Sequence, residues 1–176
     1  MANRAERRLL LLRHAKSAWP DVPDRDRPLA PRGLRQAPLT GAWLRSAGCQ
    51  PGLVLCSPAR RTRETWQLVA AELGTAGTVR YDERVYGASA SSLLELVRES
   101  PPSVTTLLLV GHSPGLPDLA AGLADPAASA ADALRRLTAK FPTAAVAVLH
   151  MPGNWQDLAT GGARLDSFVA PRDLER

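Results

Sequence analysis

The chain contains 176 residues, 45% of them hydrophobic, and its 22 Lys and Arg residues exceed its 17 Asp and Glu residues to give a formal net charge of +5. This length is typical of one ordinary domain, and the apolar fraction is sufficient for a core without a disulfide or metal staple. The composition excludes a disordered chain, a collagen and a disulfide-rich scaffold. We therefore expect residues 1–176 to form a single domain. Only Lys16 and Lys140 are lysines, so almost all of the basic charge is arginine.

The two cysteines, Cys49 and Cys56, are too few for a disulfide framework, and no second Cys or His pair accompanies them to complete a zinc site. They are typical of reduced thiols in a cytoplasmic protein. The apolar run Leu9–Leu12 is shorter than the roughly 7–15 residues of a secretory signal. No run approaches the ~20 apolar residues of a transmembrane helix. We expect a soluble, cytoplasmic protein without membrane association.

Short apolar runs alternate with longer amphipathic stretches along the chain. In chain order, the sequence predicts a strand at Leu9–Leu12, a surface loop at Pro20–Pro31, a helix at Gly33–Ser46, a strand at Leu53–Cys56, a helix at Thr62–Leu73, a helix at Ser91–Glu99, a strand at Val104–Val110, a helix at Asp132–Lys140, a strand at Ala144–Leu149, and a pair of short edge strands at Trp155–Thr160 and Arg164–Val169. Strands that alternate with helices favour an α/β fold, here a three-layer α/β/α sandwich with a largely parallel central sheet.

Each of the three histidines, His14, His112 and His150, follows an apolar strand directly. Taken singly, each could simply end its strand. In an open α/β sheet, however, ligands bind outside the carboxyl ends of the strands, so two histidines from separate strands can meet over one crevice. The residues around His14 and His112 favour that interpretation, whereas His150 has no such neighbours and is expected to be structural.

Arginines and serines accompany the first two histidines. Arg13 precedes His14 and Ser17 follows it, while Ser113 follows His112. The segment 57–63, which reads Ser-Pro-Ala-Arg-Arg-Thr-Arg, comes after another strand and opens a helix. A helix N-terminus offers free N–H groups to an anion, and Arg binds planar oxyanions through two hydrogen bonds. The residues at these three strand ends, around His14, Ser57 and His112, therefore predict one anion-binding site.

Together, these segments resemble the histidine phosphatase (phosphoglycerate mutase-like) superfamily. The matching residues are Leu11–Ser17 around the Arg-His-Gly signature, Ser57-Pro58 with Arg61 and Thr65 for the pattern Ser-Pro-x-x-Arg-x-x-x-Thr, and Val110–Ser113 around the second histidine. Ala15 replaces the usual glycine of the signature. The chain looks most like the small SixA-type phosphohistidine phosphatases, which share its short length, the segment Arg27–Gly33 and a turn with Tyr86-Gly87-Ala88. The resemblance spans residues 8–150.

The resemblance implies a metal-independent phosphatase without a cofactor, in which His14 is the nucleophile and becomes a transient phosphohistidine. Arg13 and Arg61 would bind the phosphoryl oxygens, and a charged His112 would donate a hydrogen bond to the same group. Surrounding cations favour the neutral, nucleophilic form of His14 by lowering its pKa. Ser17 and Ser113 would add substrate contacts, although Ser17 could equally begin a helix. Two further residues, Arg60 and Arg63, are expected to be solvated at the start of their helix.

The general acid is less well defined by the sequence. The resemblance makes Glu83 the positional candidate, while Asp21, Asp24 and Asp26 lie in the loop after the signature motif and could reach the site instead. Phosphohistidine has a good leaving group, so a strong acid can be dispensable. Pro20 stands where members that act on sugar phosphates commonly carry Asn, which argues against a mutase.

Two other interpretations compete with a histidine phosphatase. Residues 111–115 also fit Gly-x-Ser-x-Gly, the nucleophile elbow of α/β-hydrolases, with Ser113 as the nucleophile. That elbow uses the N–H of the next residue in its oxyanion hole, and Pro114 has none. A non-catalytic anion-binding or nucleic-acid-binding module would account for the charge, but the arginines are scattered among acids and are not interleaved with aromatic residues.

The sequence thus predicts a phosphatase that removes phosphate from phosphohistidine on a protein. A small-molecule phosphomonoesterase of the same superfamily is the alternative. The expected partner is a phosphorylated protein or a small phosphorylated substrate, and not a nucleic acid. The sequence leaves the oligomeric state open.

Overall fold

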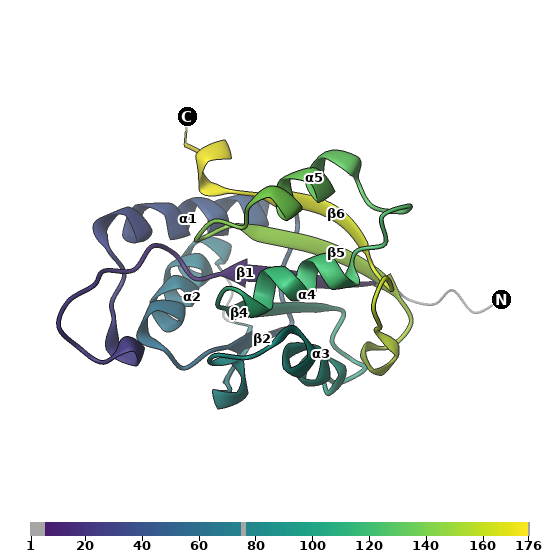
Figure 1. The fold of residues 1–176 in the computed structure, drawn as a ribbon, viewed down its shortest axis with the longest axis horizontal. Coiled ribbons are helices and arrows are strands. Elements are labelled where there is room, and N and C mark those ends of the chain that lie inside the picture. The colour runs from purple at the N-terminus through teal and green to yellow at the C-terminus, as the bar shows by residue number, and fades with distance from the viewer. Residues whose placement is uncertain (1–5, 75–76, 176) are drawn as a thin grey trace.

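A six-stranded sheet lies at the centre of the molecule (Figure 1), as seen in a computed structural model that describes residues 6–74 and 77–175. Its strands are β1 (Glu6–Arg13), β2 (Leu53–Cys56), β3 (Thr78–Tyr81), β4 (Thr106–Gly111), β5 (Val146–Pro152) and β6 (Arg164–Val169). Their order is β3-β2-β4-β1-β5-β6. The first four in this order are mutually parallel, while β5 runs antiparallel to both β1 and β6. The predicted, largely parallel sheet is confirmed.

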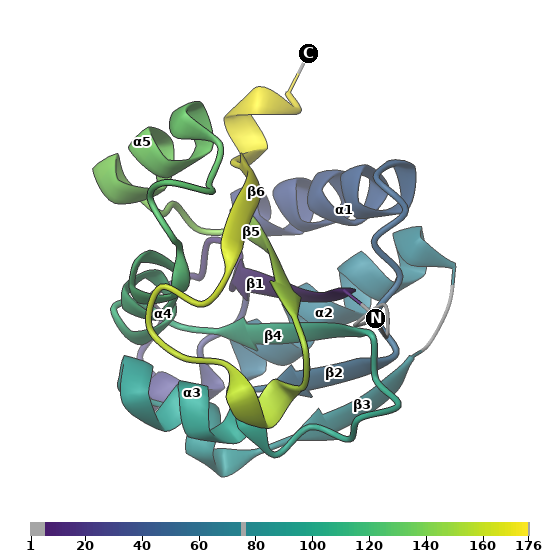
Figure 2. The ribbon, with the colours of Figure 1, turned by 90° about the vertical axis from the view of Figure 1, so that its right-hand side faces the viewer.

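Helices cover both faces of this sheet (Figure 2). They are α1 (Pro31–Ser46), α2 (Arg60–Leu73), α3 (Ala90–Arg98), α4 (Gly115–Leu123) and α5 (Ala131–Ala139). Figure 2 shows α1 and α2 on one side and α3, α4 and α5 on the other. The core divides accordingly, because Leu10 and Leu108 pack with Trp66 of α2, whereas Leu9 packs in a separate cluster with Leu119 of α4. The α/β/α sandwich is therefore confirmed.

The leucine run of β1 explains why the strand lies in the middle of the sandwich. Successive side chains of a strand point to opposite faces, so Leu9 and Leu11 enter one half of the core, while Leu10 and Leu12 enter the other. All four are at most 1% exposed. Burying each leucine contributes about 1.5–3 kcal/mol. A continuous apolar run is what a strand covered on both faces requires.

The four predicted helices are confirmed within two residues at each end, and α1 continues through Pro38. Two elements were not predicted. The edge strand β3 has no buried residue, so it lacks the apolar run that marks a central strand. Helix α4 begins at Gly115 and contains Pro117, two residues that usually interrupt helices.

The predicted strand at Trp155–Thr160 is wrong. The chain there forms a 3-10 turn over Trp155–Asp157, and β6 pairs with β5 instead. Trp155 is 1% exposed, and its Nε1 donates to the carbonyl oxygen of Val104 at 2.8 Å. The indole anchors a loop beneath α3, so its apolar character reflects burial and not strand pairing.

The register of the sheet brings distant segments to one edge. Arg13 lies opposite Gly111, and the N–H of His14 donates to the Gly111 carbonyl at 3.0 Å, so His14 and His112 leave neighbouring strands at the same level. The antiparallel β5 begins at this edge, where Ala144 donates to the carbonyl of His14 at 3.1 Å. His150, further along β5, lies opposite Arg8 and thus towards the other edge.

In the described part of the chain, none of the helices is long and apolar enough to cross a membrane.

Candidate active site

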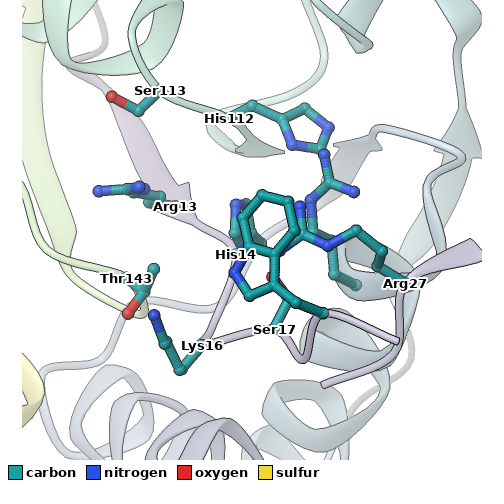
Figure 3. A pocket seen from close by; sticks show the side chains of 10 residues that line it. Arg13, His14, Lys16, Ser17, Arg27, His112, Ser113 and Thr143 are labelled. Atoms are coloured by element: carbon teal, nitrogen blue, oxygen red, sulfur yellow. The ribbon is translucent and has the colours of Figure 1, made fainter. Parts of the chain in front are cut away.

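A cavity of about 240 Å³ opens at the carboxyl edge of the parallel strands (Figure 3). It is lined by Arg13, His14, Lys16, Ser17, Trp19, Arg27, Arg61, His112, Ser113 and Thr143. The structure thus brings together every predicted site residue except Glu83. Four of the lining side chains are cations and none is a carboxylate. A cavity with this lining favours an anion.

His14 is held in one tautomer by its own backbone. Its Nδ1 lies 2.8 Å from the carbonyl oxygen of Ala15. Because a carbonyl only accepts hydrogen bonds, Nδ1 carries the proton, and the lone pair of the neutral ring is on Nε2. The residue is 8% exposed, and its ring centroid lies 5.4 Å from that of His112. Nε2 is therefore the atom available for nucleophilic attack.

The surroundings of His14 keep this ring neutral. Burial lowers its pKa to about 3, and repulsion from His112 when that ring is protonated, and from Arg61 and Arg13, acts in the same direction. The hydrogen bond to Ala15 opposes these effects but does not overcome them. The neutral form expected from the neighbouring cations is thus the form at neutral pH, although burial contributes more than the cations do.

Thr65 connects His14 to helix α2. The N–H of Ala15 donates to Thr65 Oγ1 at 2.9 Å, and this hydroxyl donates in turn to the carbonyl of Arg61 at 2.7 Å. Both Thr65 and Ala15 are fully buried. Since the Ala15 carbonyl accepts from His14, the threonine fixes the peptide that orients the nucleophile. Thr65 was part of the sequence motif, but the sequence suggested no role for it.

His112 has one partnered and one unpartnered ring nitrogen. Nε2 lies 2.7 Å from Ser57 Oγ, whereas the buried Nδ1 has no hydrogen-bond partner. The serine hydroxyl can donate to Nε2, which leaves Nδ1–H as a donor. Burial lowers the pKa of His112 to about 4, with Arg61 and Arg13 acting in the same direction and Asp24 opposing them. The ring is therefore neutral here, whereas the resemblance implied a charged one; an anion in the cavity would raise this pKa.

The two predicted arginines are anchored by oxygen atoms. Arg13 Nη1 donates to the Phe141 carbonyl at 2.7 Å. Arg61 donates through Nη1 to the carbonyl of Asp24 at 2.8 Å and through Nη2 to its carboxylate at 3.1 Å. The Nε atoms of both arginines are buried without a partner, as is Nδ1 of His112. Since unsatisfied buried donors are costly, three of them in residues that line one cavity indicate a site for an oxyanion.

The structure separates Arg61 from its neighbours. Arg61 is buried in the cavity wall, whereas Arg60 is exposed and pairs with Glu64 at 2.7 Å, and Arg63 is exposed. Arg60 and Arg63 thus lie at the surface, as expected.

The carboxylates considered as general acids lie outside the cavity lining. The side chain of Glu83 is 70% exposed and pairs with Arg25 at 2.8 Å, which lowers the pKa of this carboxyl. Asp24 accepts from the Tyr86 hydroxyl at 2.5 Å and from Arg27 at 3.0 Å, in addition to Arg61. The Tyr86 hydroxyl above all, then the two arginines, holds the pKa of Asp24 far below its usual range, so Asp24 stays ionised. The other two, Asp21 and Asp26, are exposed.

Three lining residues were not assigned a role from the sequence: Lys16, Arg27 and Thr143. Arg27 donates to Ser17 Oγ at 2.7 Å and lies 3.2 Å from the centroid of the Trp19 ring. Ser17 does not begin a helix, because α1 starts only at Pro31. Arg27 could have been found from the motif that contains it. Thr143 had no sequence signal, since it reaches the site only because β5 is antiparallel.

Comparison with known proteins identifies the family to which the chain belongs. Residues 9–151 match the family model of the histidine phosphatase superfamily (branch 1). The chain belongs to this superfamily. An uncharacterized protein of Mycobacterium tuberculosis strain H37Rv is 45% identical over 162 residues, which cover 92% of this chain and 100% of that protein. The residues matched by the family model, 9–151, include every residue that lines the cavity.

Solved structures place the histidine phosphatase in the SixA-type branch. The proposed phosphohistidine phosphatase SixA of Nakamurella multipartitia is 37% identical, with a TM-score of 0.80 over 94% of this chain and 96% of that one. The proposed SixA of Agrobacterium tumefaciens is 30% identical, with a TM-score of 0.77 over 94% and 98% of the two chains. These similarities support a phosphatase with the phosphoglycerate mutase-like fold.

Proposed function

We propose that this histidine phosphatase hydrolyses phosphohistidine on a protein through a covalent phosphohistidine at His14. The observation that carries the proposal is the convergence of a free imidazole Nε2 with three unpartnered buried N–H donors in one cavity. A nucleophile surrounded by cationic and N–H donors is what phosphoryl transfer requires, since charge must be stabilised on three phosphoryl oxygens.

The first step forms the bond between His14 Nε2 and phosphorus while the bond from phosphorus to the leaving nitrogen breaks, and the leaving nitrogen keeps the electron pair. Arg13, Arg61 and the Nδ1–H of His112 donate to the phosphoryl oxygens throughout. The modified His14 ring becomes cationic, which strengthens its Nδ1–H bond to the Ala15 carbonyl. In the second step, a water oxygen attacks phosphorus, the electron pair returns to Nε2, and the water proton leaves to solvent.

The placement of the carboxylates supports phosphohistidine over an ordinary phosphate ester. An alcohol would leave as a strongly basic alkoxide unless an acid protonated it, whereas a phosphohistidine ring that carries a proton on its other nitrogen leaves as neutral imidazole, whose protonated form has a pKa of about 6.5. Asp24 and Glu83 lie outside the cavity lining and are held ionised, Asp24 by the Tyr86 hydroxyl and then Arg27 and Arg61, and Glu83 by Arg25. Trp19 at the rim is 76% exposed and offers apolar surface to a protein substrate. We place the reaction in the cytoplasm, where the buried thiols of Cys49 and Cys56 stay reduced.

A small-molecule phosphomonoesterase is the second candidate. The cavity of about 240 Å³ accommodates a compact phosphate ester, and Lys16 and Arg27 add cations beyond the catalytic set. Such an enzyme would prefer small phosphates to any phosphorylated protein.

The test combines trapping with a substrate comparison. Brief incubation with a phosphohistidine protein, followed by denaturation at alkaline pH and intact-mass measurement, should show one phosphoryl group on the wild type and none on His14→Ala. The variant His150→Ala is the matched control, because it removes the same ring from the other end of the sheet. The proposal fails if His14→Ala turns over as fast as the wild type. A higher kcat/KM for sugar phosphates than for phosphohistidine protein would favour the second candidate.

A further inference from the structure

Four exposed cations beside the catalytic cavity form no hydrogen bond or ion pair within the described residues. They are Lys16, Arg32, Lys140 and Arg172, and we call them the groove cations. Most other basic side chains are engaged: Arg84, for example, pairs with Asp82 and Glu99, and Arg135 pairs with Asp132. Among the described residues, much of the unpaired positive charge therefore lies next to the active site.

Two adjoining hollows beside the catalytic cavity, which we call the groove, carry three of these cations, while Lys16 lines the cavity itself. A hollow of about 170 Å³, lined by Arg32, Lys140 and Arg172, shares Thr143 with the cavity. A second hollow, of about 250 Å³, shares Lys140 and Arg172 with the hollow of about 170 Å³. Figure 3 shows Lys16 and Thr143 on the same side of the cavity, and Thr143 also lines the neighbouring hollow. The groove therefore adjoins the catalytic cavity at Thr143.

The fold holds the start of helix α1 against the wall of the cavity. A Cβ at Gly33 would lie 2.2 Å from the carbonyl oxygen of Lys16, and the same oxygen accepts from Ala30 at 2.8 Å. Only glycine permits this approach, which places Arg32 beside the segment that carries Lys16. The adjacency of these two cations is thus built into the backbone.

Acidic residues near the groove leave most of this charge unbalanced. Asp173 pairs with Arg136 and accepts from the N–H of Ala170, and these contacts lower its pKa, with a smaller contribution from the charge of Arg172. Glu175 accepts from Gln36 at 2.8 Å and lies on the side of α1. Both of these carboxylates have other hydrogen-bond partners, so the four groove cations favour an anionic partner.

We propose that the groove cations bind an acidic segment of the phosphorylated protein, next to its phosphohistidine. This inference rests on the proposed function and names the substrate feature that the enzyme recognises. The cations come from the loop after β1, from α1, from the residue that follows α5 and from the 3-10 turn Pro171–Asp173. A row of charges spread over four segments matches several carboxylates along a chain better than one compact phosphate. Exposed pairs of this kind contribute mainly specificity and association rate.

The experiment measures binding of a fluorescent hexaglutamate peptide by anisotropy, with the catalytic cavity saturated with inorganic phosphate. The test variant is Lys140→Glu/Arg172→Glu. The matched control is Arg45→Glu/Arg164→Glu, which makes the same charge change at two exposed arginines away from the groove. We expect the test variant to bind about tenfold more weakly or worse, the control to stay within about twofold of the wild type, and added salt to weaken binding.

Kinetics provide a second readout. The test variant should lose kcat/KM on a phosphohistidine protein with acidic residues beside the phosphorylated histidine, and keep its kcat/KM on an aryl phosphate too small to reach the groove. Equal hexaglutamate binding by the test and control variants would overturn the proposal. So would tighter, groove-dependent binding of a single-stranded oligonucleotide of equal charge, because it would identify a nucleic-acid site.

The two proposals fail in different ways. Binding is also measured on His14→Ala, which should retain hexaglutamate affinity because the groove lies outside the catalytic residues. A wild type without any phosphatase activity would refute the proposed function alone, whereas loss of the groove effect in an active enzyme would refute only the acidic-segment site.

Discussion

Acidification should destabilise this protein through its two active-site histidines. In the folded state the pKa of His14 is about 3 and that of His112 about 4, against 6.5 for an unperturbed histidine. As the pH falls below 6.5, the unfolded chain takes up a proton on each ring while the folded protein does not. The free energy of unfolding therefore decreases with falling pH, and each loss levels off only when the pH reaches the folded pKa of that ring.

The magnitude follows from the size of these shifts. For each ring, the free energy of unfolding falls by about 1.4 kcal/mol for every pH unit below the pKa of that ring in the unfolded chain. At about pH 5, which is above both folded values, the loss is about 2 kcal/mol for each ring and about 4 kcal/mol for the pair. A typical domain is stable by only about 5–15 kcal/mol, so the effect is readily measured.

Urea unfolding at about pH 7.5 and about pH 5, in a phosphate-free buffer, tests this prediction. The variants His14→Asn and His112→Asn should each lose about 2 kcal/mol less than the wild type between the two pH values. Comparing the two pH values within each variant cancels any direct effect of the substitution on packing. The reasoning is refuted if both variants lose as much stability as the wild type. Saturating phosphate should reduce the wild-type loss, because a bound anion raises both folded pKa values.

Three further predictions concern the catalytic residues. Thr65→Val should leave the buried N–H of Ala15 unpaired, lower the free energy of unfolding by about 1–3 kcal/mol and reduce kcat about tenfold. Thr65→Ser should retain both stability and kcat, as measured by thermal unfolding and steady-state kinetics. A fully active Thr65→Val would contradict the role of this hydroxyl. Glu83→Gln should change kcat/KM for phosphohistidine protein by less than about twofold, because this carboxylate lies outside the cavity lining and pairs with Arg25. A loss of more than about tenfold would restore Glu83 as the general acid. Incubation with EDTA should leave phosphatase activity unchanged, since Arg13 and Arg61 supply the positive charge at the phosphoryl group. Loss of activity in EDTA that is reversed by adding a divalent ion would count against the mechanism.

The strand ends show how far the motifs predict the site. Arg13, His14 and His112 follow buried runs directly, and parallel neighbours bring such residues to one edge, so their convergence could be predicted before any coordinates were known. The same logic does not distinguish Arg61 from Arg60, which differ only in the side of α2 they occupy. Nor does it assign Asp24, because a loop residue has no periodicity to indicate its direction.

The sequence by itself determined the class of fold, the buried strands and the residues that carry the chemistry, because burial patterns and strand-end motifs are local properties of the chain. Only the tertiary structure decided the rest. The antiparallel course of β5 brings Thr143 to the cavity. Asp24 pairs with Arg61 and is therefore excluded as a proton donor. Gly33 allows α1 to approach the cavity wall, which places Arg32 beside the other groove cations. Each of these depends on contacts between segments far apart along the chain. The positive charge has the same dual origin: its amount is a property of the composition, whereas its concentration beside His14 is a property of the fold.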